Sequence, residues 1–144
     1  MNYMREVDGF VYVYQGAKGV KLKEYHCRCV LDAWCMRYGS SYEGRRQAAM
    51  CFLHQKHLVP IYIKPDMIVF PTYDIEGEPL WINYVHVAKL TKNQNNSTSF
   101  VFCDGSQVSS TMSYGSIVKQ ILYTQLLMYA MLGYCNEALK AYVH

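Results

Sequence analysis

Apolar and polar positions alternate in short runs through the first two-thirds of the chain, a pattern typical of β-strands with one exposed face. Residues 9–14 (GFVYVY) predict a first strand, and residues 20–25 (VKLKEY) predict its hairpin partner. Asp104-Gly105 predicts a tight turn later in the chain. Further strands are predicted at residues 61–64, 67–70 (ended by Pro71), 81–87, 100–103 and around Val108.

Helical spacing of apolar residues appears before and after the central strands. Ser40 and Glu43 have the spacing of a capping box, which predicts where the second helix begins. Gly39 and Gly133 are predicted to end two of the others. The predicted helices lie at residues 29–38, 41–53, 116–132 and 136–142. The chain is therefore expected to be one α+β domain, residues 1–144, with a mostly antiparallel sheet and a long C-terminal helix.

The long helix at residues 116–132 is apolar over a wide arc. This breadth fits two arrangements, a central helix buried on all sides or a helix that also forms a contact between subunits. The pattern of the helix alone favours neither.

Composition favours an ordinary globular domain. The 144 residues are 51% hydrophobic, enough to bury a core without cross-links. No basic-then-apolar leader is present, so the six cysteines are expected to be free thiols in a reducing cytoplasm, with Cys51 buried. His26, Cys27, Cys29 and Cys35 lack a second ligand pair for zinc, and no cysteine stands in a catalytic motif. We therefore expect no metal, no cofactor and no membrane partner.

The predicted helix at residues 41–53 has an arginine among its apolar positions. At about 100° per residue, one face is expected to contact the core through Tyr42, Ala48, Ala49, Phe52 and Leu53. Arg45 falls on this face and Arg46 at its edge. Because an unpaired buried charge is costly, Arg45 either pairs with a carboxylate or projects from the helix start toward an anion. Ser40 and Ser41 can add hydroxyl donors to such a site.

Four runs of residues resemble motifs of the ComK family in the same order. Residues 35–46 (CMRYGSSYEGRR) are similar to a segment in which G-S-S-Y-x-G-R is followed by Arg or Lys. The other three runs are residues 60–63 with 69–72 (PIYI and VFPT), residues 81–87 (WINYVHV) and residues 113–116 (SYGS). Each motif is short, but four in order along residues 35–129 are more specific than any one.

This resemblance implies a transcription regulator that activates competence-type genes and binds AT-rich double-stranded DNA, largely through the minor groove. It implies a homo-oligomer on paired boxes, in the cytoplasm at the nucleoid, without catalysis. A-tract minor grooves attract arginine, and lysines near phosphates position the protein. The expected DNA-binding residues are Arg37, Ser40, Ser41, Tyr42, Arg45, Arg46, Lys89 and Lys92, with Lys21 and Lys23 as further phosphate contacts.

Glu43 puts a negative charge inside the best motif, where it would weaken the attraction of phosphate locally, but it is also the capping-box partner of Ser40. Two features keep an alternative open, a protein-interaction module on the same fold without DNA binding. The formal charge is only +3, and the chain ends soon after its last long helix. The family's better-known members are longer there, in a region linked to oligomerisation and to capture by a proteolytic adaptor.

Overall fold

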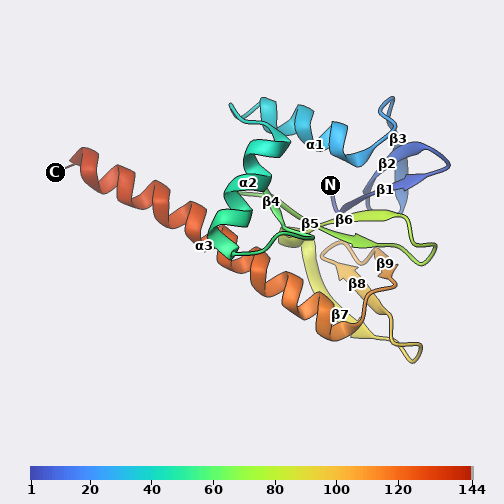
Figure 1. Ribbon diagram of the computed structural model, residues 1–144. Coiled ribbons are helices and arrows are strands. Elements are labelled where there is room, and N and C mark those ends of the chain that lie inside the picture. The colour runs from blue at the N-terminus through green and yellow to red at the C-terminus, as the bar shows by residue number, and fades with distance from the viewer. Residues whose placement is uncertain (144) are drawn as a thin grey trace.

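The computed structural model describes the backbone of residues 1–143 and the side chains of residues 1–133. Within this part of the chain, nine strands form two antiparallel sheets, and three α-helices pack against them (Figure 1). The elements are β1 (Tyr3–Val7), β2 (Phe10–Gln15), β3 (Lys18–Lys21), α1 (Cys27–Met36), α2 (Tyr42–Leu53), β4 (Ile61–Lys64), β5 (Met67–Tyr73), β6 (Pro79–Asn83), the 3-10 helix η1 (Tyr84–His86), β7 (Val87–Lys92), β8 (Thr98–Phe102), β9 (Gln107–Ser110) and α3 (Tyr114–Val143).

The larger sheet has the strand order β3-β2-β1-β6-β5-β4, and the smaller one has the order β7-β8-β9. Every pair of neighbouring strands in them is antiparallel. The predicted α+β class, with mostly antiparallel strands and a long C-terminal helix, is therefore confirmed. Strand β1 was not predicted, because Arg5 and Glu6 interrupt its apolar pattern; it pairs with β2 on one side and β6 on the other.

Several predicted boundaries are wrong. The single strand expected at residues 81–87 is divided, since the side chain of Asn83 accepts a hydrogen bond from the backbone N–H of Val85 and starts η1. The chain then enters the smaller sheet as β7. Pro71 does not end β5, which continues to Tyr73, and β3 occupies Lys18–Lys21 instead of residues 20–25. Helix α3 runs through Gly133, so no separate helix follows.

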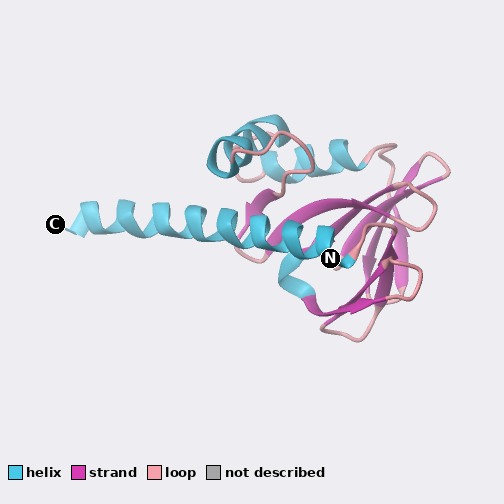
Figure 2. Cartoon of the chain, turned by 60° about the horizontal axis from the view of Figure 1, so that its bottom comes forward, coloured by secondary structure: helices cyan, strands magenta, loops and turns pink. Residues whose placement is uncertain are grey.

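Alternate side chains of the larger sheet turn to opposite faces and enter three buried clusters. Met4, Val69 and Trp81 pack against α1 through its buried Val30 and Leu31. Tyr3, Phe70, Leu80 and Ile82 turn to the other face, where they meet Phe100 and Phe102 of the smaller sheet and Ile117 of α3. Helix α1 thus lies on one side of the strands and the smaller sheet on the other (Figure 2). Helix α2 lies at the β4 end of the sheet, where its Ala49 packs with Tyr62, Ile68 and Leu127 of α3.

Helix α3 buries one face and exposes another. Gln120 is buried and donates from Nε2 to the carbonyl oxygens of Leu58 and Pro71, at 2.8 and 3.1 Å. On the opposite side Leu122, Leu126 and Tyr129 are 54%, 58% and 69% exposed. The arrangement with the helix buried on all sides is therefore wrong. The C-terminal half of α3 projects away from the rest of the molecule (Figures 1 and 2).

Candidate nucleic-acid interface

Helix α2 begins at a serine, but not the one that the capping box predicts. Ser41 is the N-cap, and its Oγ accepts a hydrogen bond from the backbone N–H of Gly44 at 2.9 Å. Ser40 lies one residue earlier, and its hydroxyl faces the carbonyl of Ser41 at 3.5 Å. Asp32 of α1 accepts from the N–H of Tyr42 at 2.9 Å, so a carboxylate already occupies the helix start. This contact reduces the attraction of the helix N-terminus for a further anion.

Arg45 lies on the inner side of α2, as its position in the helical pattern predicts. Its guanidinium carbon lies 5.8 Å from the centre of the Tyr62 ring. Its Nε is buried and has no hydrogen-bond partner among residues 1–133. Within the same residues, no carboxylate lies within 4.0 Å of the Arg45 guanidinium. Of the two alternatives for Arg45, the carboxylate pair is thus wrong among the described residues, and a cation–π contact takes its place. Binding of DNA by Arg45 stays a prediction.

The buried face of α2 is rotated relative to the predicted one. Ala49 is fully buried and packs with Met50 and Leu53 against β4, β5 and α3. Phe52 was expected in this contact but is 52% exposed, and Cys51 is exposed as well. Tertiary packing causes this rotation, because β4 and α3 together cover the side of α2 on which Met50 lies.

Arg46 and Arg28 share one carboxylate across two helices. Arg46 Nη1 lies 3.2 Å from Glu43 Oε1, and Arg28 Nη2 lies 3.9 Å from Glu43 Oε2. The guanidinium of Arg28 also lies 5.5 Å from the centre of the Tyr42 ring. The Arg28 side chain is 71% exposed and that of Arg46 is 33% exposed, so both retain donors toward solvent.

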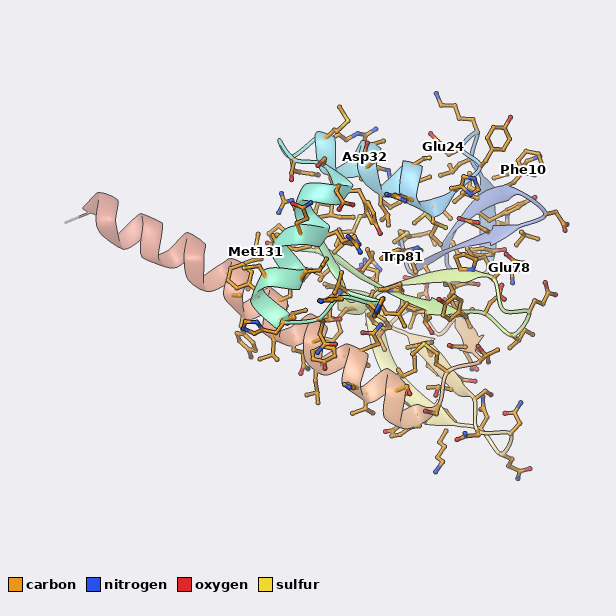
Figure 3. All side chains as sticks on the ribbon, viewed as in Figure 1. Phe10, Glu24, Asp32, Glu78, Trp81 and Met131 are labelled. Carbon is orange, nitrogen blue, oxygen red and sulfur yellow. The ribbon has the colours of Figure 1, made fainter. Side chains whose placement is uncertain are left out.

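These two arginines open onto a cavity of about 320 Å³ between the starts of α1 and α2, the loop after α2, and the β5–β6 hairpin. We call it the basic cavity. Trp81, labelled in Figure 3, lies within it and meets the Tyr42 ring edge-on at 6.3 Å. Burial raises the pKa of the Tyr42 hydroxyl, which therefore stays neutral. The basic cavity is lined by three cationic side chains and one imidazole: Arg28, Arg46, Lys56 and His57. Glu6 is the carboxylate in the lining.

A rim of cations suits an anionic ligand such as the phosphate backbone of a nucleic acid. The backbone N–H of Cys27, at the first turn of α1, is bonded to Glu6 Oε1 at 2.9 Å. Glu6 is therefore engaged in the fold, and its single negative charge is outnumbered in the lining by Arg28, Arg46 and Lys56.

The structure brings together only part of the predicted site. Ser40, Ser41, Tyr42 and Arg46 lie around the start of α2, next to the basic cavity. Arg37 follows α1 at its far end and lines other depressions, beside Trp34. Lys89 and Lys92 are exposed on β7 in the smaller sheet, on the other side of the larger sheet from α1 (Figure 1). Whether these three contact DNA stays a prediction.

Arg28, Lys56 and His57 border the basic cavity but were not predicted. Arg28 reaches it only because α1 packs beside α2. Lys56 and His57 lie in the loop after α2. This loop reverses direction because His54 and Leu58 have positive φ angles, 52° and 51°. No local motif marks these positions, so only the tertiary fold identifies them.

The five cysteines whose side chains are described are all free. Cys27 and Cys35 are buried, as expected of free thiols, but Cys29, Cys51 and Cys103 are exposed. Cys135 lies outside the described side chains. Among the described residues, no three His, Cys, Asp or Glu side chains gather as metal ligands would, and no helix has the length and hydrophobicity of a membrane span.

Comparisons with known proteins agree with the sequence motifs. The model of the ComK protein family matches residues 12–133. A competence transcription factor of Bacillus subtilis (strain 168) is 29% identical to the chain over 101 residues, which make up 68% of this chain and 53% of that relative. The chain thus spans about half the length of the curated relative it matches. No solved structure matches it.

Proposed function

The chain belongs to the ComK family, and from this premise we propose that it is a DNA-binding transcription regulator rather than an enzyme. The observation that carries the proposal is the family match over residues 12–133, which includes every residue that lines the basic cavity except Glu6. We propose further that it acts at the nucleoid in the cytoplasm, activates competence-type genes, and binds AT-rich duplex DNA largely through the minor groove.

The basic cavity supports this proposal through its exposed arginines. A guanidinium group has five N–H donors, and the contact with Glu43 engages only part of them in Arg28 and Arg46. The narrow minor groove of AT-rich DNA has an enhanced negative potential that attracts such groups. Lys56 on the same rim provides a phosphate contact, which fixes the position of the protein without reading sequence.

We also propose that the protein binds DNA as a homo-oligomer through α3. Leu122, Leu126 and Tyr129 share one exposed face of this helix at a spacing of four and three residues. Large apolar side chains at helical spacing are typical of a helix–helix contact. Sedimentation velocity should show an oligomer that the Leu122→Glu, Leu126→Glu double variant reduces to monomer; an unchanged sedimentation coefficient would exclude this face.

Fluorescence anisotropy with labelled duplexes tests the DNA proposal. We expect the full chain to bind an AT-rich duplex more tightly than a GC-rich duplex of equal length, at about 100 mM salt. Arg46→Ala should weaken binding to the AT-rich duplex by roughly tenfold, since one specific contact contributes about 1–3 kcal/mol. Lys18→Ala, which removes one exposed charge on β3, is the matched control and should bind as the wild type does.

One observation favours a second function, a protein-interaction module without DNA binding. Glu43 lies against both Arg28 and Arg46 and partly neutralises them. If neither duplex gives an anisotropy change even at low salt, this second function replaces the first.

A further inference from the structure

A second depression lies between the edge strand β3 and helix α1. Its volume is about 520 Å³, and we call it the β3 groove. Strand β3 pairs with β2 and ends the described sheet, so no strand covers its outer side, and all four of its residues are exposed. Glu24, labelled in Figure 3 near Phe10, lines the groove. The apolar side chains of its lining are Val13, Val20, Leu22, Val30, Ala33 and Trp34.

Three cations border this apolar surface. Lys21, Lys23 and Arg37 line the β3 groove, and none of them has a carboxylate within 4.0 Å among the residues whose side chains are described. The ammonium group of Lys21 lies 3.7 Å from the centre of the Phe10 ring, which holds it in place. Glu24 is the only carboxylate in the described lining, so the groove carries excess positive charge.

We propose that the β3 groove binds an extended acidic segment of a partner protein, which adds to β3 as a further strand. An edge strand offers unpaired N–H and C=O groups to an incoming backbone. Alternate side chains of that segment point to one side of the new strand, where Val20, Leu22 and Trp34 provide an apolar surface. The unpaired cations select carboxylates on the segment. Strand β3 has four residues, so about four residues of the bound segment can pair with its backbone.

An acidic peptide fits this groove better than a nucleic acid does. A duplex would place phosphates over the apolar side chains of the groove and leave the edge of β3 without hydrogen-bond partners. In contrast, a peptide backbone satisfies the edge and its side chains cover the apolar surface. The proposal uses no residue of the basic cavity, so peptide binding in the groove and DNA binding at the cavity can be tested separately. It assigns Lys21, Lys23 and Arg37 to a peptide in place of the DNA contacts that the family resemblance implies.

The test uses a fluorescein-labelled eight-residue peptide that alternates glutamate with valine or leucine, and the full chain without DNA. We expect saturable binding that is about tenfold weaker for the same peptide with glutamine at every glutamate position. Lys21→Glu with Lys23→Glu should weaken binding to a similar degree or more. Arg46→Ala should bind the peptide as the wild type does. Because Lys21 and Lys23 are exposed, the variant with glutamate at both positions should keep the wild-type melting temperature.

Amide hydrogen exchange distinguishes strand addition from a loose charge contact. The bound peptide should slow exchange at residues 18–21, in addition to any effect on α1. No binding, equal binding of the glutamine peptide, or binding without protection of β3 would overturn the proposal. It would also be overturned if an AT-rich duplex protected β3 and competed with the peptide, since the groove would then belong to the DNA interface.

Discussion

Two basic regions flank α1, and they differ in what accompanies the charge. At the start of the helix, Arg28, Arg46 and Lys56 surround the basic cavity, and Glu43 lies against both arginines. At its far end, the β3 groove has an equal number of cations, without carboxylate partners among the described residues and beside an apolar surface. The comparison teaches that the number of cations does not identify a partner. The neighbouring carboxylates, aromatic rings and free backbone edges do.

The carboxylate of Glu43 does not disqualify the basic cavity as a DNA interface. Ion pairs at the surface contribute about 0–1 kcal/mol, because solvent screens them and ordering the side chains costs entropy. A DNA phosphate can therefore replace Glu43 as the partner of Arg28 or Arg46 at little cost.

Charge reversal gives the largest expected difference between the two regions. Replacing Arg28, Arg46 and Lys56 with glutamate should weaken binding to an AT-rich duplex by at least about 100-fold. The matched variant with glutamate at Lys21, Lys23 and Arg37 changes the net charge equally and should weaken binding much less, through the long-range field alone. Anisotropy titrations measure both. Equal losses would mean that DNA responds to overall charge and that neither region is its site.

Loss of the helix cap should destabilise the fold on the side of the basic cavity. Ser41→Ala removes the acceptor of the Gly44 N–H and should lower the free energy of unfolding by about 1 kcal/mol. Ser40→Ala should cost only a few tenths of that value, because Ser40 does not cap α2. Urea denaturation followed by circular dichroism compares the two. A larger loss for Ser40→Ala would restore the capping box that the sequence predicts.

Removal of the shared carboxylate should strengthen DNA binding. Glu43→Gln keeps the size of the side chain but frees Arg28 and Arg46 from a negative neighbour, so affinity for the AT-rich duplex should rise by about threefold. Asp8→Asn, an exposed charge removed from the β1–β2 turn, controls for net charge and should have no such effect. Weaker binding of Glu43→Gln would show that Glu43 instead orients the arginines.

The smallest expected effect is that bound DNA protects a nearby cysteine from alkylation. Cys29 is exposed beside Arg28 and Tyr42, whereas Cys27 is buried, and burial raises the pKa of its thiol. At about pH 8, iodoacetamide should modify Cys29 and leave Cys27 intact, as mass spectrometry of peptides can show. AT-rich duplex should slow the reaction of Cys29 but not of the distant Cys103. The acidic peptide should protect neither, and protection of Cys29 by that peptide would join the two regions into one surface.

The sequence predicted the class of fold and most strands, because the alternation of apolar and polar residues depends only on which face of a strand is buried. It did not predict which serine caps α2, since Ser40 and Ser41 both precede suitable residues. Asp32, ten residues earlier, contributes by accepting the N–H of Tyr42. The division of residues 81–87 likewise depends on Asn83, whose side chain also donates to the carbonyl of Met1.

The candidate site was predicted in part for a similar reason. Arg46 lies in the motif that resembles ComK, and the structure places it at the basic cavity. Arg28 and Lys56 reach the same cavity through helix packing and a loop reversal, which no local pattern encodes. For Arg45 the sequence predicted the position on the apolar face but not the partner. That partner is the ring of Tyr62, which β4 contributes.

The dependence of DNA affinity on salt tests most directly whether the basic cavity meets the phosphate backbone. Each phosphate contact contributes a slope of about −0.9 to the plot of log K against log salt concentration. Replacing Arg28, Arg46 and Lys56 with alanine should therefore reduce the magnitude of the slope by up to about 2.7, whereas alanine at Lys21, Lys23 and Arg37 should leave it unchanged. An unchanged slope for the first variant, with a reduced slope for the second, would contradict the assignment.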